Sequence, residues 1–120
     1  MKRTVNIIKE KLSIDQGIYR YENDDYDGWM YTNKDNKNNI HRNKGGGYWP
    51  LLNFWMCTYL IESGKERKAL KYYNKVIDDL AEKKYIPEQI FNNCIQASIS
   101  PLCWSHAMFI IASKRLKFLE

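Results

Sequence analysis

The residues of this 120-residue chain that could do chemistry are aromatic side chains placed beside acids and glycines. Aromatic residues make up 14% of the sequence, and a group of them lies between positions 19 and 49: Tyr19, Tyr21, Tyr26, Trp29, Tyr31, Tyr48 and Trp49. Core aromatics more often follow helical spacing. Aromatic rings with polar groups suit ligands that have both apolar faces and many hydroxyls. Sugars are such ligands, so the group is compatible with a carbohydrate site without being specific for one.

Composition and charge argue against several other classes of function. The net charge is +5, but the basic residues are scattered and acids lie among them, as in residues 62–68. No dense basic stripe or nucleic-acid motif is present, so we expect no nucleic-acid partner. The longest apolar stretches, residues 49–60 and 108–112, are interrupted or too short to span a bilayer. No apolar leader follows Met1, so we expect no membrane attachment and a cytoplasmic location.

The sequence predicts neither a metal site nor a cofactor. Its cysteines are odd in number and lack paired spacing, so we expect reduced thiols: Cys57, Cys94 and Cys103. The two histidines, His41 and His106, are far apart and have no second ligand at helical spacing. Ser105 precedes His106, but adjacent residues of a helix point in different directions. We therefore exclude nucleophilic catalysis by that pair.

Four helices are predicted, and they alternate in character. Residues 2–13 and 65–83 each have one apolar stripe opposite charged residues, which is typical of surface helices. Residues 50–63 and the first part of 102–119 are apolar on nearly all sides, which is typical of buried helices. A simple four-helix bundle would make all four one-sided. The outer, inner, outer, inner order instead predicts two concentric layers, as in an α/α toroid, with further helices elsewhere.

The connections between these helices predict where a site lies. The turn at 62–64 is tight, whereas the segments 14–49 and 84–101 are long. Successive helices in such a stack are antiparallel, so both long segments emerge at the same end. Long loops are usually functional, and we predict the active end there. Within the first, residues 32–43 indicate a flexible insertion rich in Asn and Lys, and Gly45-Gly46-Gly47 is expected to turn the backbone tightly.

Four short motifs in order resemble the end of a family 15 glycoside hydrolase, the family of glucoamylases, glucodextranases and some microbial trehalases. They cover nearly the whole chain: Arg20-Tyr21 with Asp24 and Tyr26, Gly47-Tyr48-Trp49 before an apolar helix, Pro87-Glu88-Gln89, and Pro101-Leu102-Cys103-Trp104-Ser105-His106-Ala107. The resemblance implies an all-α fold, part of an (α/α)6 toroid of the six-hairpin glycosidase type, with about four alternating outer and inner helices. Residues 1–120 would be a C-terminal fragment of a glucoamylase-like catalytic domain.

The resemblance also implies roles for single residues. Glu88 matches the general base of an inverting O-glycosyl hydrolase, which activates a water while a separate carboxylic acid protonates the leaving oxygen. Gln89 could hold that carboxylate or a substrate hydroxyl. Arg20 and Asp24 resemble a substrate-contacting pair, because guanidinium and carboxylate groups can each bind two sugar hydroxyls. The competing interpretation of that pair is a surface ion pair. Further substrate contacts are implied for aromatic residues, with core packing as the competing interpretation: Tyr26, Trp49 and Trp104.

The family's general acid lies in an upstream Glu-Glu segment that has no counterpart in this chain. We therefore expect little or no hydrolysis of α-glucan oligosaccharides or trehalose by this chain alone. We also expect its bare inner helices to favour pairing with a separate N-terminal chain or self-association. Two non-catalytic alternatives remain open. One is a tetratricopeptide-like interaction module, although no repeat of about 34 residues is visible; the other is a degenerate toroid kept for interaction.

Overall fold

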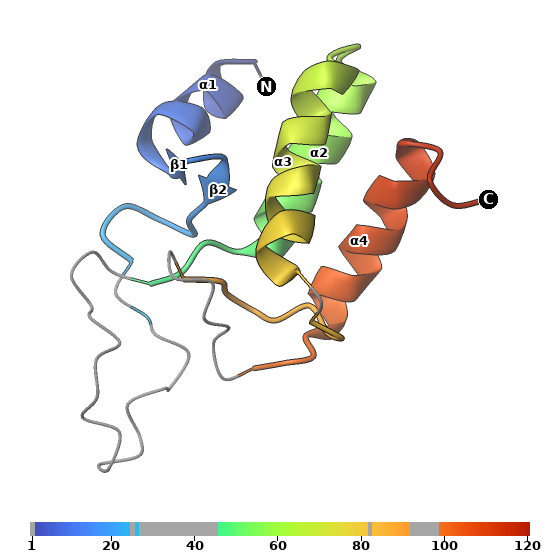
Figure 1. The fold of residues 1–120 in the computed structure, drawn as a ribbon. Helices are drawn as coiled ribbons and strands as arrows, with labels where there is room; N and C mark the ends of the chain where they lie inside the picture. The colour runs from blue at the N-terminus through green and yellow to red at the C-terminus, as the bar shows by residue number, and fades with distance from the viewer. Residues whose placement is uncertain (1, 25, 27–45, 82, 92–98) are drawn as a thin grey trace.

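The computed structural model describes residues 2–24, 26, 46–81, 83–91 and 99–120 (Figure 1). Four helices and one small hairpin follow in chain order: α1 (Lys2–Lys11), β1 (Ser13–Ile14), β2 (Gly17–Ile18), α2 (Pro50–Glu62), α3 (Glu66–Leu80) and α4 (Cys103–Arg115). The mostly helical fold predicted from the sequence is thus confirmed. The expected insertion at 32–43, together with Trp29, Tyr31, His41, Gly45 and Cys94, lies outside the described residues.

Local sequence explains where α2 and α3 begin and end. Pro50 occupies the first turn of α2, where a missing N–H costs nothing. The connection to α3 passes through Gly64 at φ 69°, a left-handed conformation in which glycine avoids the Cβ penalty. Glu66 then places a negative charge in the first turn of α3, next to the positive end of the helix dipole.

The hairpin was not predicted, and the first helix is shorter than expected. α1 ends at Lys11, two residues before the predicted end, because Ser13–Ile14 pairs antiparallel with Gly17–Ile18. The turn between the strands uses two non-glycine residues at positive φ, Asp15 (48°) and Gln16 (63°). Two consecutive positive φ values are the geometry of a type I′ hairpin turn. Asp-Gln lacks the Asn-Gly or Asp-Gly pair that announces such a turn, which is why it escaped detection.

The core forms where α2 packs against both α3 and α4. Phe54 of α2 is fully buried, and its ring centroid lies 5.7 Å from that of Tyr73 and 5.8 Å from that of Phe109. Leu60 and Val76 are also fully buried. Figure 1 shows α1 and α4 on opposite sides of the α2–α3 pair. This aromatic cluster fixes the three helices that carry the loops described below.

Burial follows the predicted alternation for α2 and α3, and α4 departs from it. α3 buries a single stripe, whereas α2 buries residues on most of its circumference: Pro50, Leu51, Asn53, Phe54, Met56, Cys57 and Leu60. α4 is also apolar on most sides, but it buries only Ser105, Ala112 and Ser113. Trp104, Ile110 and Ile111 of α4 are exposed. An inner helix of a toroid is covered only when its further neighbours are in place, so this bare face agrees with the sequence-based expectation.

Within the described residues, the structure shows no helix long and apolar enough to cross a membrane. The same residues contain no group of three or more His, Cys, Asp or Glu side chains that could hold a metal ion.

Candidate active site

The predicted active end forms where three separate segments are joined by backbone hydrogen bonds. Tyr48 N donates to Ile90 O at 3.0 Å, and Ile90 N donates to Tyr48 O at 2.9 Å. Trp49 N donates to Ile18 O at 2.8 Å, which adds the hairpin to the pair. Figure 1 shows the start of α2 and the described chain after α3 at one end of the helices, the turn between α2 and α3 at the other end, and the hairpin beside the helices. The described residues 46–49 and 84–91 of the two long connections therefore meet at one end of the fold, as the antiparallel order of the helices predicted.

One buried asparagine in α2 holds the hairpin to the helices. Asn53 Oδ1 accepts a hydrogen bond from Ile18 N at 2.8 Å. Its Nδ2 donates to Gln16 O at 2.8 Å and to Tyr72 O at 3.1 Å. All of these partners are distant in sequence, and the side chain is fully buried. Sequence reasoning missed this residue because an Asn in an apolar helix carries no local sign of its partners.

A second anchor, also missed from the sequence, fixes the segment that carries Trp49. The Tyr48 hydroxyl donates to Asp79 Oδ2 of α3 at 2.8 Å. Lys75 Nζ lies 2.8 Å from the same oxygen and neutralises the carboxylate. α3 therefore anchors this segment through the Tyr48 hydroxyl.

Positions 46 and 47 require glycine because other backbone segments lie too close to leave room for a Cβ, and not because their own backbone conformation is unusual. The sequence predicted a tight turn, but among the described glycines only Gly64 has a positive φ. A Cβ at Gly47 would lie 2.7 Å from Ile90 O and 2.8 Å from Ile90 C. A Cβ at Gly46 would collide with Tyr26 O and would lie 2.9 Å from Gln89 Oε1. Gly46 lies at a bend, Gly45 lies outside the described residues, and Gly46 and Gly47 pass between two other chain segments that leave no room for a Cβ.

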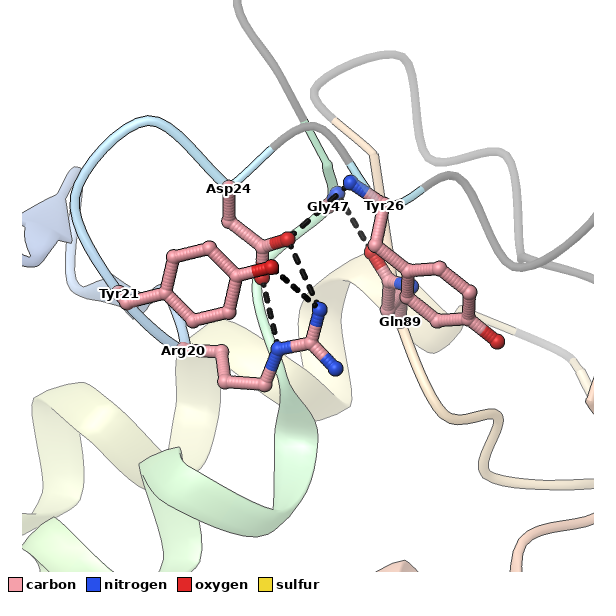
Figure 2. Close-up of polar contacts among 6 residues, drawn as sticks. All are labelled: Arg20, Tyr21, Asp24, Tyr26, Gly47 and Gln89. Atoms are coloured by element: carbon pink, nitrogen blue, oxygen red, sulfur yellow. Dashed lines mark hydrogen bonds and ion pairs between the residues drawn. The ribbon is translucent and has the colours of Figure 1, made fainter.

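Arg20 and Asp24 form a two-point ion pair at the centre of this loop cluster (Figure 2). Arg20 Nε lies 3.1 Å from Asp24 Oδ2, and one terminal guanidinium nitrogen lies 3.0 Å from Oδ1. Tyr26 N donates to the same Oδ1 at 3.1 Å, and Gly46 N donates to the Asp24 carbonyl oxygen. The Asp24 side chain is 0% exposed, whereas that of Arg20 is 36% exposed. The carboxylate is therefore enclosed, and the guanidinium is the member of the pair that reaches solvent.

Three aromatic rings surround the Arg20 guanidinium. Its Cζ lies 4.7 Å from the ring centroid of Tyr21 and 5.0 Å from those of Tyr26 and Trp49. Such distances allow cation–π attraction. Burial acts to lower the pKa of Arg20, but its hydrogen bonds to Asp24 and Tyr21 and their charges outweigh it and raise that pKa. The structure thus brings together Arg20, Asp24, Tyr26 and Trp49, four of the residues singled out from the sequence.

Glu88 and Gln89 lie on the neighbouring segment, and each has one buried polar atom without a partner among the described residues. Gln89 is fully buried, and its Oε1 accepts a hydrogen bond from Gly47 N at 2.8 Å (Figure 2). Three buried side-chain atoms have no hydrogen-bond partner among the described residues: Glu88 Oε2, Gln89 Nε2 and Trp49 Nε1. Buried polar atoms are nearly always paired in folded proteins, so each exception requires an explanation. All three belong to residues that the sequence assigned to substrate or to catalysis.

The beginning of α4 fixes the backbone around Glu88. Ser105 Oγ donates to Pro87 O at 3.1 Å, and Glu88 N donates to Ile99 O at 2.9 Å. His106 Nε2 accepts from Ile86 N at 3.3 Å, while its Nδ1 lies 2.9 Å from Leu102 O. Since a carbonyl oxygen only accepts, Nδ1 carries the proton. Ser105 and His106 therefore bind the loop backbone and not each other, in agreement with the exclusion of a nucleophile–base pair.

Trp104 stands apart from the other predicted site residues. It lies in the first turn of α4, next to Ser105, and its side chain is 69% exposed. Trp104 is therefore not part of the core that the described residues form.

Comparison with known proteins supports the fold. The structure is similar to solved glycosidases, including a wild-type form at TM-score 0.73 and 22% identity. A variant with a phenylalanine-to-tyrosine substitution matches at TM-score 0.74 and 23% identity, and one with a glutamate-to-alanine substitution, in complex with glucose, at 0.74 and 21%. Each match covers 99% of this chain and 31% of the glycosidase chain. No protein-family model and no curated protein matches the sequence.

These likenesses show a fold that is a partial all-α toroid, as the sequence predicted. The chain spans about a third of the length of the glycosidases that it resembles.

Proposed function

We propose that this chain is part of a glycoside hydrolase of the glucoamylase type, in family 15, that hydrolyses α-glucosidic bonds with inversion. The observation that carries the proposal is a set of buried polar atoms of Trp49, Glu88 and Gln89 that have no hydrogen-bond partner among the described residues, on a glycosidase-like fold. A sugar hydroxyl can donate and accept hydrogen bonds, so a bound sugar would pair both the indole and amide donors and the carboxylate acceptor.

Glu88 is the proposed general base. Its backbone N–H donates to Ile99 O, and the carbonyl of the preceding residue, Pro87, accepts a hydrogen bond from Ser105 Oγ. Its side-chain Oε2 has no partner among the described residues. A carboxylate held in this way would accept a proton from a water molecule as that water attacks the anomeric carbon. In an inverting enzyme the water enters between this base and a carboxylic acid about 6.5–9.5 Å away. That acid would come from the part of the toroid that this chain does not supply.

Arg20 is the proposed sugar-contacting member of its ion pair, and Asp24 is proposed to position it. The Asp24 carboxylate is enclosed by its bonds to Arg20 and Tyr26 N, whereas the guanidinium is partly open to solvent. The rings of Tyr26 and Trp49 flank that guanidinium and offer apolar faces to a pyranose ring. Gln89 would add its free amide group, and Trp104 would contact a sugar further from the bond that is cleaved.

The proposed substrates are α-glucan oligosaccharides or trehalose. One of the similar glycosidases was solved in complex with glucose, the unit common to both substrates. Because general acid catalysis contributes roughly 10²–10⁴-fold in rate, a base without its acid should leave little activity. The test is glucose release from maltotriose and from trehalose by this chain. We expect little or no release. Robust release would contradict the expected inactivity of the chain alone. If that release disappeared in Glu88→Gln, it would still support the role of Glu88 as the base.

A second candidate function is a non-catalytic toroid used for interaction. The exposed apolar side chains of α4, Trp104, Ile110 and Ile111, favour it. The two functions differ in one cheap measurement, the thermal stabilisation of the chain by a pseudo-oligosaccharide inhibitor of the acarbose type. Stabilisation that is lost in Arg20→Met supports the sugar site, and its absence in the unmodified chain supports the interaction module.

A further inference from the structure

Four hydrogen bonds among the described residues tie positions 86–88 to positions 99–106, and one of the four differs in kind from the rest. Three of them join backbone or hydroxyl groups that stay neutral: Leu102 N to Ile86 O at 3.0 Å, Ser105 Oγ to Pro87 O at 3.1 Å, and Glu88 N to Ile99 O at 2.9 Å. The fourth runs from Ile86 N to His106 Nε2 at 3.3 Å. Because the imidazole is the group in this set that takes a proton near neutral pH, the fourth bond depends on pH.

His106 can accept the hydrogen bond from Ile86 only while its ring is neutral. Its Nδ1 lies 2.9 Å from Leu102 O, so the single proton of the neutral ring lies on Nδ1 and leaves a lone pair on Nε2. A second proton would occupy that lone pair, and Nε2–H would then face Ile86 N–H as one donor facing another. Ile86 is buried, so its N–H would be left without an acceptor and away from bulk water. Protonation of the ring therefore breaks this bond.

The described surroundings of the ring offer a positive charge no partner. An open cavity of about 250 Å³ borders His106, and its other lining residues come from α3, from the segment after it and from α4: Ile77, Leu80, Ala81, Lys83, Lys84, Ile86 and Phe109. The titratable groups that face the ring are Lys83, Lys84 and Tyr85, whose ring centroid lies 6.5 Å from that of His106. No acid among the described residues forms an ion pair with His106. The cavity gives a protonated ring room to turn away from Ile86.

We infer that His106 is a positioning residue, whose neutral ring holds the segment of Glu88 in place and whose protonation releases that segment. The contact runs through Ile86, two residues before Glu88, so the effect on the carboxylate is a loss of position and not a change in its chemistry. The inference deepens the proposed function and rests on it for the role of Glu88 as the base. It adds that a hydrolase built on this site loses activity in mild acid through a residue that binds the loop backbone.

The test follows the backbone amides of Ile86 and Glu88 by nuclear magnetic resonance of the isotopically labelled chain, between about pH 8 and about pH 5. Hydrogen exchange at each amide, corrected for the intrinsic effect of pH on exchange, measures its protection. The carbon-bound ring protons of His106 report the protonation of that ring. His106→Gln is the decisive variant, because Gln Oε1 can accept from Ile86 N–H but takes no proton in this range. His41→Gln is the matched control, since His41 is the other histidine of the chain.

The inference predicts that the protection of both amides falls at least about tenfold in acid, with the same midpoint as the His106 ring. The fall should persist in His41→Gln and disappear in His106→Gln, while the amide of Leu60 in the buried core keeps its protection.

Constant protection of Ile86 and Glu88 while the His106 ring takes its proton would overturn the inference. An equal fall in His106→Gln, or an equal fall at Leu60, would also overturn it. The titration of the parent chain alone decides the matter if a variant does not fold. The readout needs no sugar, so amides that respond as predicted in a chain whose Trp49 indole signal ignores glucose would contradict the proposed function and leave the switch standing.

Discussion

Removal of the Asp24 carboxylate should destabilise the chain far more than removal of an exposed acid nearby. Asp24→Ala deletes the two-point bond to Arg20 at 3.1 and 3.0 Å and the bond from Tyr26 N at 3.1 Å. The control is Glu22→Ala, which breaks an ion pair to Lys11 at 3.4 Å whose side chains are 51% and 57% exposed. The two substitutions remove the same charge from positions two residues apart, so their difference isolates the effect of burial.

The expected magnitude follows from what each deletion leaves behind. Breaking a buried ion pair by removing one partner costs about 3–5 kcal/mol, because the other charge stays buried without compensation. Arg20 is 36% exposed and keeps its Tyr21 contact, so water recovers part of that loss and we expect about 2–3 kcal/mol. The Lys11–Glu22 pair is exposed and should contribute no more than about 0.5 kcal/mol.

Urea unfolding of both variants and the parent, followed by circular dichroism, measures the difference. The reasoning requires a lower midpoint for Asp24→Ala at an unchanged denaturant slope. A loss of stability equal to that of Glu22→Ala, within about 0.5 kcal/mol, would refute the account of Asp24 as an enclosed anchor of Arg20.

Two further predictions concern backbone approach and thiol chemistry. Gly47→Ala should cost about 1–3 kcal/mol of stability in the same urea assay, because the new Cβ would lie 2.7 Å from the Ile90 backbone. The control is Gly64→Ala, where a Cβ would meet nothing within 4 Å. Its φ of 69° alone should cost only about 1 kcal/mol. The second prediction uses a Cys94→Ser variant, which leaves Cys57 and Cys103 as its thiols. Ellman's reagent near neutral pH should modify the exposed Cys103 and leave Cys57 unmodified until the chain unfolds. The reason is that burial raises the pKa of Cys57 to about 11, so that its reactive thiolate is scarce. Modification of both thiols at one rate would contradict this.

The helices were predictable from the sequence because their signal is local. The apolar stripe of α3 and the all-round apolarity of α2 can be counted within one segment, and both positions were placed to within a few residues. The helix ends were less accurate. α3 ends at Leu80 and not at residue 83, because Ala81 adopts a φ of 46°, and α4 ends at Arg115 and not at residue 119, shortly before Lys117 at 61°. Non-glycine residues in that conformation have no sequence signature.

The segments of the candidate site were predictable from the sequence, but the residues that anchor them were not. Arg20, Asp24, Glu88 and Gln89 were assigned to the site through a resemblance of short motifs, and that assignment stays a prediction. The antiparallel order of the helices predicted that their segments lie at one end of the fold. Asn53 and Asp79 were not found, although both hold the site segments in place. Their partners lie 35 and 31 residues away in sequence, and only the folded chain brings such distant groups into contact.

The measurement that tests the central claim most directly is a titration of the isotopically labelled chain with glucose, followed by nuclear magnetic resonance of side-chain N–H groups. Trp49 Nε1 and Gln89 Nε2 are the two buried side-chain donors without partners among the described residues, and both carry protons that this experiment observes. The account predicts that both signals shift and saturate with glucose, that the shifts disappear in Arg20→Met, and that the Trp55 indole signal stays constant. Trp49 and Gln89 signals that do not respond to glucose, or that respond equally in Arg20→Met, would contradict the assignment of this loop cluster as a sugar site.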